Sequence, residues 1–105
     1  MSVTENLEKL LAGGQETALL RYGLGSAYLK EGDTGRAIPH LARALELDPG
    51  YSAAWKAYAK ALATAGRDAE AQAAYRDGIR VAEERGDIQA AKEMGVFLRR
   101  LEKNA

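Results

Sequence analysis

The chain has 105 residues, 15 basic and 15 acidic side chains, and no cysteine. Its length predicts a single domain over residues 1–105, the missing thiols exclude disulfide frameworks and thiol catalysis, and the zero net charge argues against a nucleic-acid partner. Alanine (21 residues) and leucine (13) far outnumber the 3 valines, 3 isoleucines and 4 threonines, which predicts an all-α fold because alanine and leucine favour helices.

Apolar spacing, caps and glycine stops predict six helices. The first spans residues 4–12, starts at Thr4 as its cap and ends at Gly13-Gly14. Glycines close most of the others, and Asp48-Pro49-Gly50 stops the third. The short connections make consecutive helices antiparallel neighbours. The remaining helices are expected at about 15–31, 35–47, 51–65, 68–85 and 88–103.

The middle of the chain repeats with a period of 34 residues, which aligns residues 18–51 with residues 52–85. Only three residues are identical in the two segments, namely the pairs Ala27 and Ala61, Gly32 and Gly66, and Ala37 and Ala71. Elsewhere, small residues align with small ones and large apolar residues with large ones. This pattern is typical of helix pairs that stack on one another.

The two segments resemble the tetratricopeptide repeat family. Two departures from the family pattern are Arg21, where a tryptophan is usual, and Glu83, where a proline is usual. The motif residues are Leu24-Gly25, Tyr28, Gly32-Asp33, Ala37, Leu41, Ala44 and Asp48-Pro49 in the first segment, and Trp55, Tyr58-Ala59, Leu62, Gly66, Ala71, Tyr75 and Gly78 in the second.

The resemblance implies a right-handed α-solenoid of about five to six helices arranged as antiparallel pairs. Residues 18–51 would form the first repeat and residues 52–85 the second. Residues 4–12 and 87–103 would then be an N-terminal and a C-terminal capping helix. Trp55 and the repeat tyrosines are expected to pack inside the helix pairs rather than to bind a ligand.

The resemblance also implies a concave groove, lined by the first helix of each pair, that receives a peptide or a partner helix. Placing the last helix in the same register gives 15 groove positions, of which six are basic and none is acidic. Cations are also common near helix C-termini, so this excess has a second explanation. The candidate partner-binding residues are Tyr22, Ser26, Leu29, Lys30, Lys56, Lys60, Lys92, Val96 and Arg99.

Catalytic chemistry has little support in the sequence. The single histidine, His40, has no nearby thiol or paired hydroxyl, and no histidine spacing suggests a metal site. Asp33, Asp68 and Asp87 stand at predicted helix starts, where capping and the helix dipole explain them. We therefore expect a protein that is not an enzyme and uses no metal and no cofactor.

Two functions remain open at this stage. The leading hypothesis is an adaptor that binds a protein or peptide in the groove, and the basic groove positions favour an acidic ligand. The alternative is a structural domain that self-associates through its exposed terminal helix. For the oligomeric state, we expect a monomer or a weak homodimer.

No apolar run approaches the roughly 20 residues of a membrane helix, and the acidic N-terminus lacks a signal-peptide pattern. We therefore expect a cytoplasmic location and no membrane partner.

Overall fold

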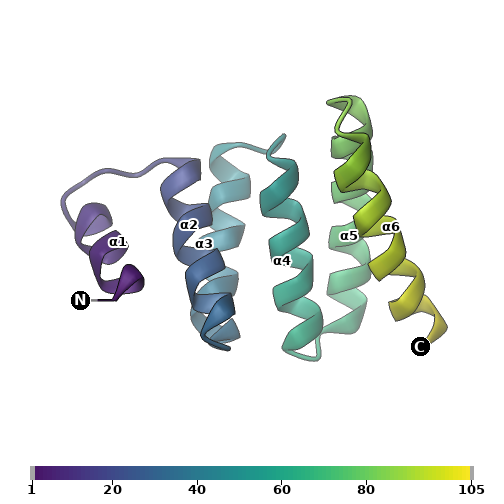
Figure 1. The fold of residues 1–105 in the computed structure, drawn as a ribbon, viewed down its shortest axis with the longest axis horizontal. Coiled ribbons are helices and arrows are strands. Elements are labelled where there is room, and N and C mark those ends of the chain that lie inside the picture. Colours follow the sequence, from purple (N-terminus) through teal and green to yellow (C-terminus); the bar gives the residue numbers. More distant parts are fainter. Residues whose placement is uncertain (1, 105) are drawn as a thin grey trace.

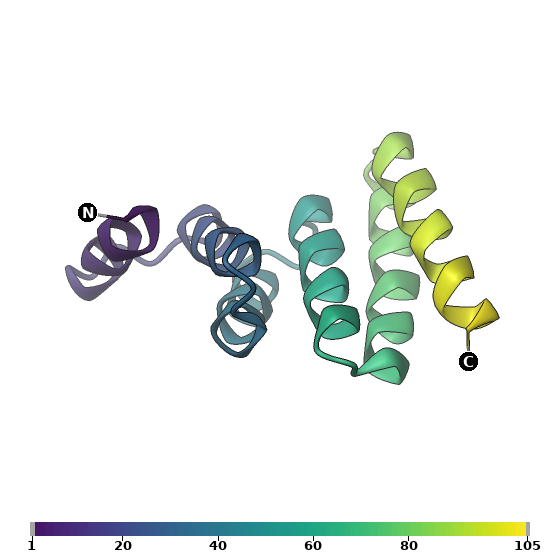
Figure 2. The same cartoon turned by 60° about the horizontal axis from the view of Figure 1, so that its bottom comes forward.

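The computed structural model describes residues 2–104, and within them it contains six α-helices and no strand. The helices lie side by side in a row of 42 × 28 × 18 Å, with the two termini at opposite ends (Figures 1 and 2). The predicted all-α helical repeat fold is confirmed. The helices are α1 (Val3–Ala12), α2 (Ala18–Lys30), α3 (Thr34–Leu47), α4 (Ser52–Thr64), α5 (Asp68–Glu84) and α6 (Ile88–Lys103).

The row has two layers, which position the functional face. In Figure 1, α2, α4 and α6 form the front layer, and α3 and α5 lie behind them. The pair α2–α3 falls within the first predicted repeat and the pair α4–α5 within the second. The flanking helix α1 packs beside α2 at one end of the row, and α6 packs on α5 at the other.

Side-chain caps explain where several helices begin. Ser2, not Thr4, caps α1. The Ser2 Oγ accepts the backbone N–H of Glu5 at 3.2 Å, whereas Thr4 is the second residue of α1 and its side chain is buried. Asp33 and Asp87 cap α3 and α6 in the same way, at 3.1 and 3.2 Å. Asp68 is instead the first residue of α5 and makes no cap bond, so its contribution is to the helix dipole alone.

Helix α2 starts three residues later than the spacing predicts. Thr17 supplies the cap, since its Oγ1 accepts the N–H of Leu20 at 3.0 Å, and this bond holds the preceding residues outside the helix. The helices α2, α4 and α5 each end at a glycine with φ between 75° and 79°. That left-handed conformation is open to glycine at little cost, which is why the glycine stops predict the helix ends well.

Small residues let the helices of each pair approach closely. A methyl group built on Gly25 of α2 would lie 2.4 Å from Leu41 Cγ of α3. One built on Gly78 of α5 would lie 2.7 Å from Met94 Sδ and 2.8 Å from Trp55 Cβ. Leu41 and Met94 are fully buried, so each fills the space that a glycine leaves open. The high alanine content serves the same close packing, since seven alanines of the core have no exposed surface.

His40 joins α1, α2 and α3 through polar contacts. Its Nδ1 accepts from Arg21 at 3.0 Å, its Nε2 lies 3.2 Å from Glu8 Oε1, and its ring stacks on Tyr28 with centroids 5.7 Å apart. Because arginine can only donate, Nδ1 must be unprotonated in this arrangement. Burial, opposed by Glu8 and assisted by Arg21, lowers the pKa of His40 below its usual 6.5. The neutral imidazole is therefore the form that the fold accommodates.

We expect the stability of the protein to fall as the pH is lowered from about 7.5 to about 5.5. The folded pKa of His40 lies below its unfolded value, so the unfolded chain binds the extra proton more readily and gains population below about pH 6.5. The urea midpoint of the parent should drop over this range, and that of His40→Gln should stay flatter. Glu16 does not confound the test, since hydrogen bonds from Arg43 and Arg21 lower its pKa to about 2. Equal slopes for the two proteins would contradict the assignment.

Candidate partner-binding groove

Two adjoining clefts run across the face that α2, α4 and α6 form. The first cleft, of ≈ 520 Å³, lies between α2 and α4, and the second, of ≈ 320 Å³, lies between α4 and α6. Lys56 and Lys60 line both, so the clefts join into one feature, which we call the groove. Its lining residues are Tyr22, Ser26, Leu29, Lys30, Ala53, Lys56, Ala57, Lys60 and Thr64 in the first cleft, with Glu93, Val96, Phe97 and Arg100 added in the second.

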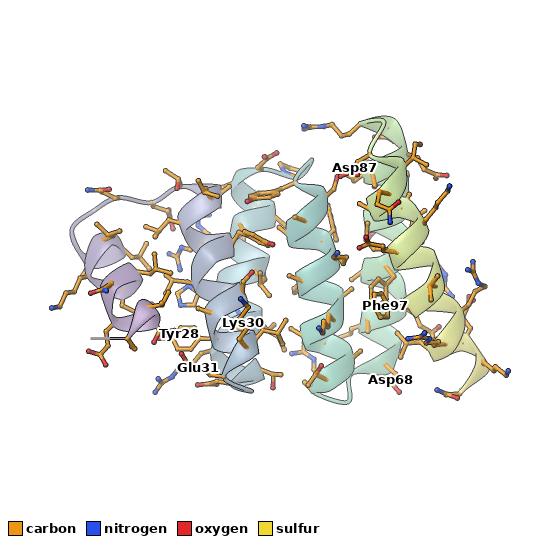
Figure 3. The ribbon with its side chains drawn as sticks, viewed as in Figure 1. Tyr28, Lys30, Glu31, Asp68, Asp87 and Phe97 are labelled. Atoms are coloured by element: carbon orange, nitrogen blue, oxygen red, sulfur yellow. The ribbon has the colours of Figure 1, made fainter. Side chains whose placement is uncertain are left out.

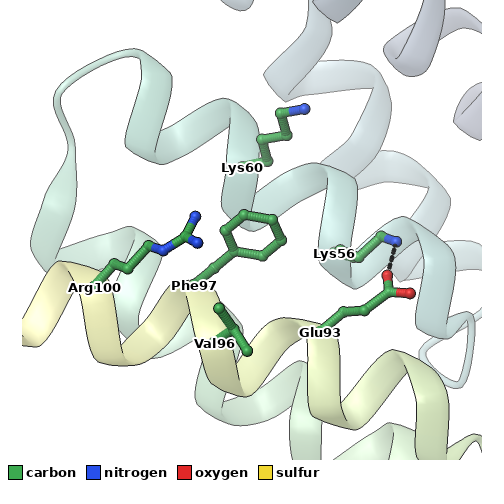
Figure 4. Close-up of a pocket in the computed structure, with 6 residues that line it drawn as sticks. All are labelled: Lys56, Lys60, Glu93, Val96, Phe97 and Arg100. Atoms are coloured by element: carbon green, nitrogen blue, oxygen red, sulfur yellow. Dashed lines mark hydrogen bonds and ion pairs between the residues drawn. The ribbon is translucent and has the colours of Figure 1, made fainter.

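Each end of the groove has an aromatic ring held in place by a neighbour. The ring of Tyr22 lies 5.0 Å from that of Tyr51, and Tyr22 packs against the buried end of α3. The ring of Phe97, which is labelled on α6 in Figure 3, stacks on that of Tyr75 with centroids 6.0 Å apart. The Arg100 guanidinium lies 5.7 Å from the centre of the Phe97 ring (Figure 4). Such fixed rings lose little conformational entropy on binding, so they suit the role of apolar anchors.

The groove is positively charged. Its lining contains four cations, Lys30, Lys56, Lys60 and Arg100, and one carboxylate, Glu93, for a formal charge of +3 among the described lining residues. Lys56 Nζ lies 2.5 Å from Glu93 Oε2 (Figure 4), and this contact, with a smaller one from Gln89, lowers the pKa of Glu93. Lys56 is therefore compensated within the protein, and the others supply the field that an incoming ligand meets.

The structure brings seven of the nine predicted site residues together in the groove. They are the six predicted residues on α2 and α4, together with Val96. Lys92 and Arg99 lie elsewhere, in a cleft between α5 and α6 that also contains Ile79. The expectation that no acidic residue lines the groove is wrong, because Glu93 does.

The orientation of α6 explains the difference. Its buried stripe, which includes Ala91 and Met94, packs on α5, and this contact turns Phe97 and Arg100 toward α4. Lys92 and Arg99 then lie on the opposite side of the stripe. Sequence reasoning missed Phe97 as a groove residue, although it lies three positions after Met94 and three before Arg100, at the edge of the stripe.

Residues 28–94 match the sequence pattern of the tetratricopeptide repeat. The chain is a tetratricopeptide repeat (TPR) protein. It is 52% identical over 99 residues to TPR repeat-containing protein PA0015 of Pseudomonas aeruginosa, covering 94% of both chains. The solved structure of BPP2914 from Bordetella parapertussis matches with a TM-score of 0.88 at 44% identity, covering 99% of this chain and 90% of that one. A TPR domain protein of Salinibacter ruber matches with a TM-score of 0.78 at 27% identity, covering 84% and 98%.

Membership of the TPR family carries coarse functional information. TPR proteins generally mediate protein–protein interactions and are generally non-catalytic. Across residues 2–104, no three histidine, cysteine, aspartate or glutamate side chains gather as a metal-binding group. None of the helices in this described part combines the length and apolarity needed to cross a bilayer.

Proposed function

We propose that this TPR protein is a non-catalytic adaptor that binds an acidic peptide or partner helix in the groove. The observation that supports the proposal is the groove's charge, with Lys30, Lys60 and Arg100 facing a ligand and the single carboxylate of Glu93 already engaged by Lys56. A ligand with acidic side chains is attracted by this field, and one with basic side chains is repelled.

The anchors at the two ends indicate how the ligand lies. Apolar side chains of the ligand pack against Tyr22 and Leu29 at one end and against Val96 and Phe97 at the other, while its carboxylates reach the cations between them. The Lys56–Glu93 contact bridges α4 and α6 beneath the ligand. Since both side chains are 39% exposed, solvent screens this bridge and it adds little to stability, so its main effect is to position the second cleft.

Charge reversal in the groove tests the proposal. The probes are two fluorescent amphipathic peptides with the same apolar residues, one with glutamates and one with lysines at the polar positions. We expect the parent to bind the acidic peptide, and Lys30→Glu with Lys60→Glu to weaken that binding by about tenfold or more, with a weaker salt dependence. Fluorescence anisotropy at two salt concentrations measures both effects.

The matched control is Lys92→Glu with Lys103→Glu, which changes the net charge equally but lies outside the groove. It should retain most of the affinity. An equal loss in both double variants would assign the effect to overall charge rather than to the groove. Binding of neither peptide, or a preference for the basic one, would contradict the proposal.

A further inference from the structure

Helix α6 has a side that no other helix within residues 2–104 covers. Gly25 on α2 and Ala59 on α4 are both buried, and each faces the second helix of its pair. Gly95 takes the corresponding place on α6, since it follows Met94 as Gly25 follows Leu24. Apart from its sequence neighbours and the backbone of α6, the nearest described atom to a methyl group built there is Arg99 Nη1, at 3.5 Å. Helix α6 is therefore the first helix of a pair whose second helix the described chain does not supply.

The uncovered side forms a cleft of ≈ 670 Å³, which we call the end cleft. Its floor is apolar, and Ile88 is 53% exposed. Lys92 and Arg99 flank the floor on α6, and Glu83 lines the cleft on α5. Of the groove's lining residues, Val96 alone also lines the end cleft, so the two features open on different sides of the molecule.

Helix α1, at the other end of the row, also has an apolar side that is exposed to solvent. A shift of 34 residues aligns α1 with α3, so that Val3, Leu7 and Leu10 match Ala37, Leu41 and Ala44. These three residues of α3 are completely buried. In contrast, Val3 is 65% and Leu10 is 44% exposed.

The other side of α1 is occupied. By the same alignment, Thr4 and Leu11 match Ile38 and Leu45 of α3. Thr4 is buried, and Leu11 packs against the core that α2 and α3 share. Helix α1 thus corresponds to the second helix of a pair, and the described residues supply no first helix for it.

We propose that α1 of a second copy of this chain docks in the end cleft, so that α6 of one molecule and α1 of the next complete a helix pair. The α2–α3 contact is the template: Gly95 takes the place of Gly25, and Val3 and Leu10 take the places of Ala37 and Ala44. Within one molecule Leu7 packs partly against α2 and Glu8 contacts His40, so the exposed Val3 and Leu10 supply the apolar contact to the floor of the end cleft.

Charge argues against the symmetric alternative. Two α6 helices packed antiparallel across Gly95 would place Lys92 of one copy beside Arg99 of the other, which is repulsive. Docking of α1 on α6 is a head-to-tail contact and does not close on itself, so it adds further copies in the same direction. The face formed by α2, α4 and α6 then continues from one molecule to the next.

Two single variants each block one partner surface. Gly95→Gln fills the end cleft, and Leu10→Glu places a charge on the exposed side of α1. Both positions leave the monomer core intact, because a side chain at 95 meets only the flexible end of Arg99, at the ordinary contact distance of 3.5 Å, and Leu10 is 44% exposed. Their matched controls are Ala73→Gln on the exposed side of α5 and Leu19→Glu, at a leucine that is 68% exposed. Circular dichroism confirms the fold of each variant.

Sedimentation velocity from about 10 μM to about 1 mM gives the readout. We expect the parent and both controls to associate into dimers and larger species. Each blocking variant should raise the dissociation constant by about tenfold or more, and an equimolar mixture of the two should form a dimer, because one intact α1 and one intact α6 remain. A monomeric parent, a mixture that does not dimerise, or loss of association in Gly95→Gln but not in Leu10→Glu would overturn the proposal. Peptide binding in the groove is a separate measurement, and either result leaves it unchanged.

Discussion

Replacing Leu41 with alanine is expected to lower the free energy of unfolding by about 2–5 kcal/mol. Leu41 has no exposed surface and packs at the centre of the α2–α3 pair, against Leu24 and Tyr28. Removing its side chain leaves a cavity that the helices can close only in part. Urea denaturation followed by circular dichroism measures the change.

The partner residue makes the prediction sharper. Gly25→Ala alone should cost about 1–3 kcal/mol, because its methyl group would lie 2.4 Å from Leu41 Cγ. In the Leu41→Ala background the same methyl group enters the vacated space, so Gly25→Ala should there be neutral or stabilising. The two substitutions are thus expected to be strongly non-additive, as for residues in direct contact.

Gly23 is the control for this cycle, since it lies two residues away on the same helix. A methyl group on Gly23 would meet only Leu7 Cδ1, at the ordinary contact distance of 3.7 Å. Gly23→Ala should therefore be neutral or stabilise the protein by up to about 1 kcal/mol, through helix propensity alone. Additive effects of Gly25→Ala and Leu41→Ala would show that the close contact does not control the packing of this pair.

Sequence reasoning predicts the helices well because their signals are local. The glycine stops, the aspartate caps of α3 and α6, and the 34-residue repetition are each readable within one turn or one repeat. The errors are also local in origin. Thr17 and Ser2 compete with other polar residues for the capping position, and their neighbours in sequence do not decide the competition.

The groove is only partly predictable because it depends on how helices rotate against each other. The residues of α2 and α4 follow the repeat, and all six predicted ones line the groove. The orientation of α6 depends instead on the fit of Met94 against Gly78 and Trp55, which lie 16 and 39 positions earlier in the sequence. The contacts of His40 with Arg21 and Glu8 likewise link three helices across the fold, and no short sequence window contains them.

Met94→Ala is expected to lower the free energy of unfolding by about 2–5 kcal/mol and to loosen α6 more than the rest of the protein. Met94 is fully buried and is the side chain of α6 that enters the space above Gly78. Helix α6 packs almost entirely on α5, so losing this contact lets it open without unfolding α2 or α3. Amide hydrogen exchange should therefore accelerate most in residues 88–103.

The same loosening should reach the groove, because α6 positions Phe97 and Arg100 in the second cleft. Met94→Ala is thus expected to weaken binding of the acidic peptide although it changes no groove side chain. Met94→Leu is the control, since it keeps the buried volume and should cost less than about 1.5 kcal/mol. Uniform acceleration of exchange along the chain would mean that α6 opens only with global unfolding. Full peptide affinity in Met94→Ala would mean that the first cleft, between α2 and α4, binds the ligand without α6.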